Sequence, residues 1–181
     1  VTIQFVSTVT YGLTIKNAAG APVPGQGGSL SPATGGPSSG GPATDTQGVL
    51  SRSVLPGTYL VVLSGGGFGA ASGLVPDNWS LFGPRKSFTD STTDPLSVTQ
   101  NASDQITLPT ISATFKVLDT AGNPVPNVNI QMSQSTFNLY NVGPYIMNSS
   151  VFANGVTGTA GTLTEVLFPA TSRLSIFFSL R

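Results

Sequence analysis

The sequence contains no cysteine and no histidine, and both absences narrow its chemistry. Without cysteine there are no disulfides and no thiolate metal sites, and without histidine there is no imidazole for acid–base catalysis or metal binding. The usual Ser-His-Asp and Cys-His triads are therefore excluded. We expect a protein that is not an enzyme and that holds no metal or cofactor.

Charge is also scarce, because charged residues make up only 8% of the chain and seven Lys and Arg balance seven Asp and Glu. A chain without a positive field is poorly suited to nucleic acid or to an anionic membrane surface. No apolar run approaches the ~20 residues that a membrane-spanning helix needs. A neutral coat of Ser, Thr, Asn, Gln and Gly is typical of extracellular proteins, so we expect an extracellular or cell-surface location with no membrane span.

The chain begins with Val, which is explained either by removal of a signal peptide or by trimming of a longer chain. Three N-x-S/T sequons begin at Asn78, Asn101 and Asn148. These residues are candidate sites for N-linked glycans if the chain is secreted.

What the sequence does contain is two copies of one unit, spaced about 100 residues apart. Residues 8–24 read TVTYGLTIKNAAGAPVP, and residues 110–126 read TISATFKVLDTAGNPVP. Further on, Gly48 and Pro56 in TDTQGVLSRSVLPGTYLVVL match Gly161 and Pro169 in TGTAGTLTEVLFPATSRLSIFF. The chain is therefore expected to hold two related domains.

Each unit has the pattern of β-structure. Short runs of alternating apolar and polar residues are bounded by Gly, Pro and Asn, which is typical of strands and turns. Asn154-Gly155 predicts a two-residue hairpin turn. No window shows a sustained helical period, so very little helix is expected.

The order strand, G-x-P-V-P, T-D-x-x-G and L-P-G-T-Y-x-V resembles the carboxypeptidase regulatory-like family. The first unit carries this pattern in residues 20–24, 44–48 and 55–61, whereas the second has Gly158 in place of Asp45 and PATS in place of PGTY. The resemblance implies two tandem Ig/transthyretin-like β-sandwiches, an all-β fold, and an extracellular scaffolding role without catalytic residues.

Several aromatic residues lie in long loops rich in Gly, Pro and Asn. Rings in such loops either form a platform on which sugars stack or plug the ends of the sandwiches. The sequence leaves both alternatives open for Trp79, Phe82, Tyr140 and Tyr145.

The two units differ in how they end. After its LPGTY strand the first unit continues to DQITLP, residues 104–109, which in such sandwiches closes the sheet, whereas the second unit stops at RLSIFFSLR. The chain instead begins with a spare strand-like segment. Its TIQFV stands before unit one as QITLP stands before unit two, and the two positions agree to within one residue. This segment consists of Val1, Thr2, Ile3, Gln4, Phe5 and Val6.

We therefore predict an N-terminal donor strand (1–6), a first sandwich (7–109) and a second, incomplete sandwich (110–181). An unclosed sheet edge invites strand addition, so residues 1–6 of one copy would fill the second sandwich of the next and give a head-to-tail homopolymer. The predicted function is a structural subunit of a pilus-like extracellular filament. Three alternatives stay open: a secreted carbohydrate-binding or adhesive module acting on surface glycans, a first segment folded onto its own molecule, and a piece cut from a longer array.

Overall fold

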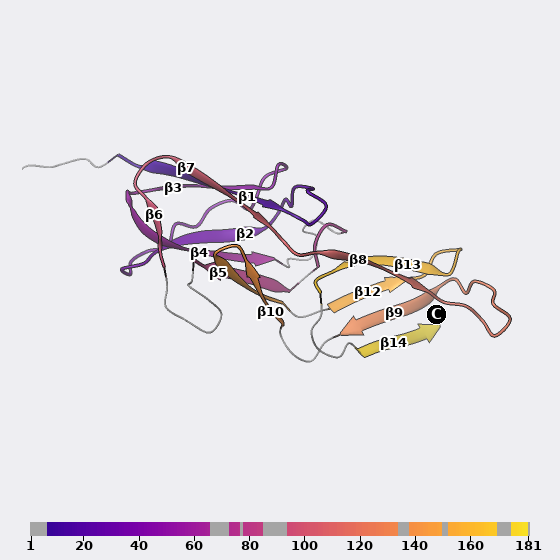
Figure 1. Cartoon of the computed structure of the whole chain (residues 1–181). Helices are drawn as coiled ribbons and strands as arrows, with labels where there is room; N and C mark the ends of the chain where they lie inside the picture. Colours follow the sequence, from indigo (N-terminus) through magenta and orange to yellow (C-terminus); the bar gives the residue numbers. More distant parts are fainter. Residues whose placement is uncertain are drawn as a thin grey trace, which may run out of the picture.

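The structure is a computed structural model that describes residues 7–65, 73–76, 78–84, 94–133, 138–149, 152–169 and 175–180. The described residues form strands and turns and contain no helix, so the predicted all-β class is confirmed. Figure 1 shows two bodies, which share a continuous path where the end of β7 leads into β8 in the same direction. We call them the first and the second sandwich; the division at residue 110 into two domains stays a prediction.

One sheet of the first sandwich has three strands in the order β3-β1-β7. These are β3 (Val49–Val54), β1 (Val9–Lys16) and β7 (Ala102–Thr107). Strand β3 is antiparallel to β1, and β7 is parallel to it. Strand β7 contains most of the DQITLP segment, so the prediction that this segment closes the first unit is confirmed.

The opposite sheet has six strands in the order β10-β11-β5-β4-β2, and β6 pairs with β4. The strands are β2 (Gly27–Pro32), β4 (Gly57–Gly65), β5 (Trp79–Gly83), β6 (Leu96–Val98), β10 (Asn138–Val142) and β11 (Tyr145–Ser149). Strands β10 and β11 form a hairpin from within the second repeat, and this hairpin pairs with β5 of the first. The sheet therefore joins the two sequence units.

The second sandwich has a two-stranded and a three-stranded sheet. The first consists of β8 (Ile111–Lys116) and β13 (Thr162–Leu167), which are antiparallel. The other has the order β12-β9-β14 and consists of β12 (Phe152–Val156), β9 (Val128–Ser133) and β14 (Ser175–Leu180).

The two copies of the repeat fold alike, which confirms the internal repeat. Strands β1, β2, β3 and β4 pair as β8, β9, β13 and β14 do. The amide of Ile15 donates to the carbonyl of Gly48 at 2.8 Å, and the amide of Val117 donates to that of Gly161 at the same distance. Thr44 and Thr157 each donate a hydroxyl proton to the carbonyl of a valine in the G-x-P-V-P turn, at 2.8 and 2.9 Å.

The hairpin turn predicted at Asn154-Gly155 is wrong. Both residues lie inside β12, where they pair with Gln131 and Ile130 of β9. Glycine is needed there for a different reason, because a Cβ atom on Gly155 would lie 2.6 Å from the side chain of Leu163 on the facing sheet. The residue marks a close approach of two layers, as glycine in a strand often does.

The main core lies between the two sheets of the first sandwich and receives side chains from both repeats. Phe168, just after β13, is 1% exposed and packs edge-on against Trp79 of β5 with ring centroids 6.4 Å apart. The hydroxyl of Tyr140 in the hairpin donates to the carbonyl of Pro169. The second sandwich has a smaller core of four buried residues: Val128, Ile130, Met132 and Leu167.

Candidate functional site

Strand β7 completes the first sandwich by adding to the edge of β1 that faces away from β3. Its Ile106 pairs with Ile15 and is buried, and Leu108 beyond the strand is fully buried and donates its amide to Lys16 at 2.8 Å. Asp104 accepts a 2.8 Å hydrogen bond from the hydroxyl of Tyr11. The strand therefore supplies backbone bonds, apolar area and one polar contact.

Among the residues that the structure describes, none forms such a strand at the matching edge of the second sandwich. Strand β8, the counterpart of β1, pairs with β13, and no strand within the described residues pairs with its other edge. We call this edge of β8 the open edge. Its unpaired backbone groups and the apolar side chains beside it are the features that favour addition of a strand.

The inward side chains of β8 show the effect of the open edge on burial. On β1 the inward residues Tyr11, Leu13 and Ile15 are fully buried. The equivalent residues of the second sandwich are only partly buried, although they pack against its core: Ala113, Phe115 and Val117. Ile111, at the start of β8, is exposed. The apolar alternation of β8 is therefore present without the cover that it has in the first sandwich.

The facing sheet shows the same difference more sharply. Phe178 of β14 pairs with the buried Ile130, so its side chain is on the inner face of the sheet, yet it is 60% exposed. At the equivalent position of β4, Leu63 pairs with Gly28 and is 0% exposed. An inward phenylalanine that remains in solvent indicates that the second sandwich lacks part of its cover.

One acidic group lies on the inner face next to this region. Glu165 of β13 pairs with Ala113, and burial raises the pKa of its carboxyl. The first sandwich has Arg52 at the same place, where the guanidinium donates to the carbonyls of Ser51 and Pro42 at 2.8 and 3.0 Å and burial lowers its pKa. Arg52 is buried, and Glu165 is partly buried.

The residues predicted to fill the open edge, 1–6, lie outside the described residues. Their role as a donor strand therefore stays a prediction. The structure does describe the start of β1, which lies at the end of the first sandwich away from the second (Figure 1). Strand β8 lies in the other body, as a head-to-tail contact requires.

Two of the four aromatic candidates for sugar stacking are buried, and two are partly buried. Trp79 and Tyr145 are buried in the main core, and the hydroxyl of Tyr145 lies 3.4 Å from that of Tyr11. Burial is the largest of the causes that raise the pKa of both tyrosines. Tyr140 packs on the same core, and Phe82 is partly buried in β5. The rings of Trp79 and Tyr145 have no face open to a sugar, whereas stacking on Tyr140 and Phe82 stays a prediction.

Two of the three sequon residues, Asn78 and Asn101, are exposed, whereas Asn148 is half-buried in β11. Asn148 accepts a 2.6 Å hydrogen bond from the hydroxyl of Ser80. Glycosylation at these positions stays a prediction.

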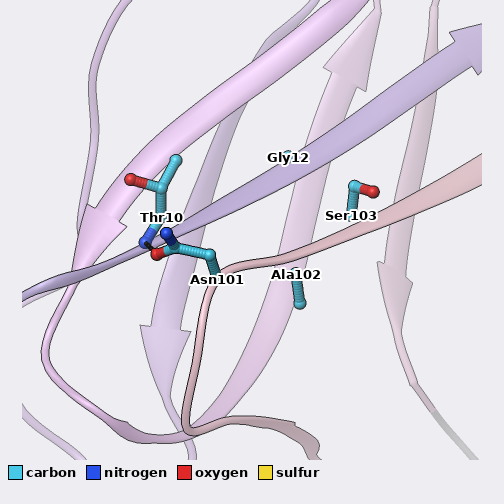
Figure 2. A pocket seen from close by; sticks show the side chains of 5 residues that line it. All are labelled: Thr10, Gly12, Asn101, Ala102 and Ser103. Atoms are coloured by element: carbon cyan, nitrogen blue, oxygen red, sulfur yellow. Dashed lines mark hydrogen bonds between the residues drawn. The ribbon is translucent and has the colours of Figure 1, made fainter.

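Asn101 also borders a shallow hollow between β1 and β7, which Figure 2 shows. Its side-chain oxygen accepts a 2.8 Å hydrogen bond from the amide of Thr10. Gly12, Ala102 and Ser103 complete the hollow, which is open because Gly12 has no side chain. These small neutral groups offer no charge or ring to hold a ligand.

Other kinds of site find no support among the described residues. No cluster of His, Cys, Asp and Glu there could hold a metal ion, and no described helix is long and apolar enough to span a membrane. The open edge of β8 is a feature of this part of the chain whose chemistry favours binding, because it can accept the backbone of an added strand.

No protein-family model and no curated protein matches the sequence. Among solved structures, the chain is similar to shaft pilin spaA from Lactobacillus rhamnosus GG, at 12% identity over 97% of this chain and 88% of that chain, with a TM-score of 0.45. It is also similar to a streptococcal ancillary pilin (14% identity, 98% and 60% covered, TM-score 0.36). It is similar as well to BcpA, the major pilin subunit of Bacillus cereus (11% identity, 96% and 64% covered, TM-score 0.35).

The chain thus spans less than two thirds of the last two pilins. Such low identities and TM-scores establish neither a family nor a function for this chain. The resemblance to the carboxypeptidase regulatory-like family stays a prediction.

Proposed function

We propose that the protein is the structural subunit of an extracellular, pilus-like filament and that copies join head to tail. Residues 1–6 of one copy add to the open edge of β8 in the next copy and complete its second sandwich. The observation that carries the proposal is the contrast between β1, which has strands on both sides, and β8, which has one strand on one side only within the described residues.

The chain itself contains the geometry of such a joint. Strand β7 closes the first sandwich and leads into β8 of the second. A segment that closes the second sandwich of one copy and leads into β1 of the next would repeat this joint between molecules. Because the donor and the open edge are different surfaces, the contact is heterologous and propagates unless the rotation closes a ring.

Composition supports a structural role outside the cell. Only 8% of the residues are charged and the net charge is zero, so copies approach each other without strong repulsion. N-linked glycans on exposed sequon residues such as Asn78 and Asn101 would add solubility to this neutral surface, and they belong to the proposal.

The experiment is to purify the full chain and a variant that lacks residues 1–6 and to examine both by negative-stain electron microscopy and size-exclusion chromatography. The full chain should form filaments and the variant should remain a folded monomer with an unchanged β-type circular dichroism spectrum. Filaments formed by the truncated chain would contradict the proposal.

A further inference from the structure

The joint between β7 and β8 serves as an internal template for the contact between copies. Strand β7 is parallel to β1, with Asp104 opposite Leu13 and Ile106 opposite Ile15. The repeat places Phe115 and Val117 at the positions of Leu13 and Ile15, since Phe115 pairs with Leu163 as Leu13 pairs with Leu50. Each position of β7 therefore has a defined counterpart beside β8.

We propose that residues 1–6 dock parallel to β8 in a single register, with Ile3 opposite Val117 and Phe5 beside Leu118, so that Val1, Ile3 and Phe5 face the core. This inference rests on the proposed head-to-tail function and specifies the binding mode of its partner, a second copy of this chain. Thr2 and Gln4 then face outward, as Gln105 and Thr107 of β7 do.

The register differs by one residue from the strict spacing of the repeat. If residues 1–6 kept the exact spacing between matching residues of the two repeats, Gln4 would take the position that Ile106 has in the first sandwich. Gln4 would then lie opposite Val117, with its amide in an apolar layer. A shift of one residue moves a whole strand's side chains to the other face, so only one of the two registers buries the apolar set. The shift places Ile3 at the Ile106 position.

The residues of the second sandwich that would contact residues 1–6 agree with the proposed register. In the first sandwich Tyr11 needs a polar partner, and Asp104 of β7 accepts its hydroxyl proton. The second sandwich has Ala113 in place of Tyr11, so no hydroxyl requires an acceptor there. In the proposed register Val1 takes the place of Asp104, so an apolar residue lies opposite the apolar Phe115.

The length of the connection agrees with the same register, and the exposed phenylalanine agrees with the addition of a strand beside β8. The connection from Phe5 to Val9 is one residue longer than that from Leu108 to Ile111, which accommodates the shift. Phe178, which is inward-facing yet exposed, lies on the sheet opposite β8 and would be covered by the added strand. In the first sandwich the equivalent Leu63 lies in the same buried core as Ile106 and Leu108, the residue of β7 and the residue just after it that face inward.

The experiment uses pairs of engineered cysteines in the full chain, which has no cysteine of its own. In the proposed register Thr2 lies opposite Lys116, because Gln105 lies opposite Thr14. Thr2→Cys with Lys116→Cys should therefore give a ladder of covalent multimers on a non-reducing gel after mild oxidation of filaments. Lys116 is exposed, and Thr2 faces outward in the proposed register, so folding should be unaffected.

Three matched pairs complete the test, each carrying a cysteine at a second position. Ile3→Cys with Lys116→Cys reports the strict register, and Gln4→Cys with Lys116→Cys reports a shift of two residues. Thr2→Cys with Ser179→Cys reports docking on β14 instead of β8. A ladder from any of these three in place of the first pair would overturn the register.

The failure of this inference is distinguishable from failure of the proposed function. Filaments whose cross-link ladder comes from the wrong pair, or from none of the four, contradict the register and leave head-to-tail assembly standing. If cross-links form only within single copies, residues 1–6 fold onto their own molecule. That result contradicts both the register and head-to-tail assembly.

Discussion

At the scale of single residues, two glycines hold the same turn in the two sandwiches. Gly48 and Gly161 have positive φ angles of 73° and 66°. A Cβ atom on Gly48 would lie 2.5 Å from the carbonyl oxygen of Ile15, and one on Gly161 would lie 2.6 Å from that of Val117. These positions need glycine both for its backbone conformation and for space.

Gly48→Ala should therefore lower the free energy of unfolding more than an alanine at a position where glycine is needed only for its backbone conformation. Gly20 is the matched control, because its φ is 80° and nothing lies within 4 Å of a Cβ atom placed there. We expect Gly20→Ala to lower the free energy of unfolding by about 1–2 kcal/mol. Gly48→Ala should lower it by about 1–3 kcal/mol more, because the backbone must move. Urea denaturation of both variants checks the difference, and equal values would contradict it.

Glu165 should make the stability of the second sandwich depend on pH. Burial raises the pKa of this carboxyl, so the folded state holds its proton at a pH where the unfolded chain has lost it. The free energy of unfolding should therefore fall as the pH rises from below the ordinary carboxyl value through the raised one. Glu165→Gln should remove this loss and stabilise the chain at neutral pH.

Thermal denaturation between pH 3 and pH 7 measures the effect, and Asp119→Asn provides a contrast of opposite sign. Hydrogen bonds from Asn123 lower the pKa of the Asp119 carboxyl, so its contribution is present at neutral pH and lost in acid. A melting curve of Glu165→Gln that follows the wild type at every pH would show that this carboxyl is not desolvated.

At the scale of elements, the β10–β11 hairpin and the residues after β13 connect the two sandwiches. The hairpin pairs with β5, and Phe168 packs against Trp79 and Tyr140 with centroids 6.4 and 6.2 Å apart. Because these contacts belong to the main core, we expect the two sandwiches to unfold together.

Phe168→Ala should break this coupling. The loss of a fully buried phenylalanine should cost about 3–5 kcal/mol and divide one unfolding transition into two. Leu55, the residue before Pro56 as Phe168 is before Pro169, is 54% exposed and provides the matched control. Leu55→Ala should change stability by less than about 0.5 kcal/mol. Calorimetry that shows a single transition in the Phe168 variant would contradict the coupling.

The sequence predicts the elements that repeat better than those that do not. The alternation of β1 and β8, the G-x-P-V-P turns and the closing strand β7 are visible because each either follows a period of two or has a matching copy. The β10–β11 hairpin has no copy, and its partner β5 is distant in the sequence. Asn154-Gly155 does not form the predicted turn, because the glycine there allows a close approach between layers.

In the candidate site too, the features that follow from the repeat are predictable from the sequence and the others are not. The repeat alone predicts that β8 lacks a partner matching β7, and no described strand pairs there. The exposure of Phe178 and the inward position of Glu165 depend instead on which face of a strand a residue occupies. The second repeat has two more residues than the first before the matching position of β14. The inner face of β14 is therefore known only from its pairing register with β9.

At the scale of the whole molecule, the proposed subunit has two complementary ends, residues 1–6 and the open edge of β8. Charge placed on the inward side of residues 1–6 should therefore prevent assembly, and charge on the outward side should not. Ile3→Asp with Phe5→Asp should abolish filaments, because carboxylates would enter an apolar layer. Thr2→Asp with Gln4→Asp is the matched control and should assemble, with stronger dependence on salt. Light scattering of both variants measures this, and the opposite order would contradict the assignment of faces.

The central claim is tested most directly by an electron cryomicroscopy map of the assembled protein in which strands can be traced. In that map the sheet of β8 and β13 should gain a third strand, parallel to β8, and this strand should lead into β1 of the neighbouring copy. A map in which the edge of β8 is sealed by its own polypeptide, or is bare while residues 1–6 lie elsewhere, would contradict it.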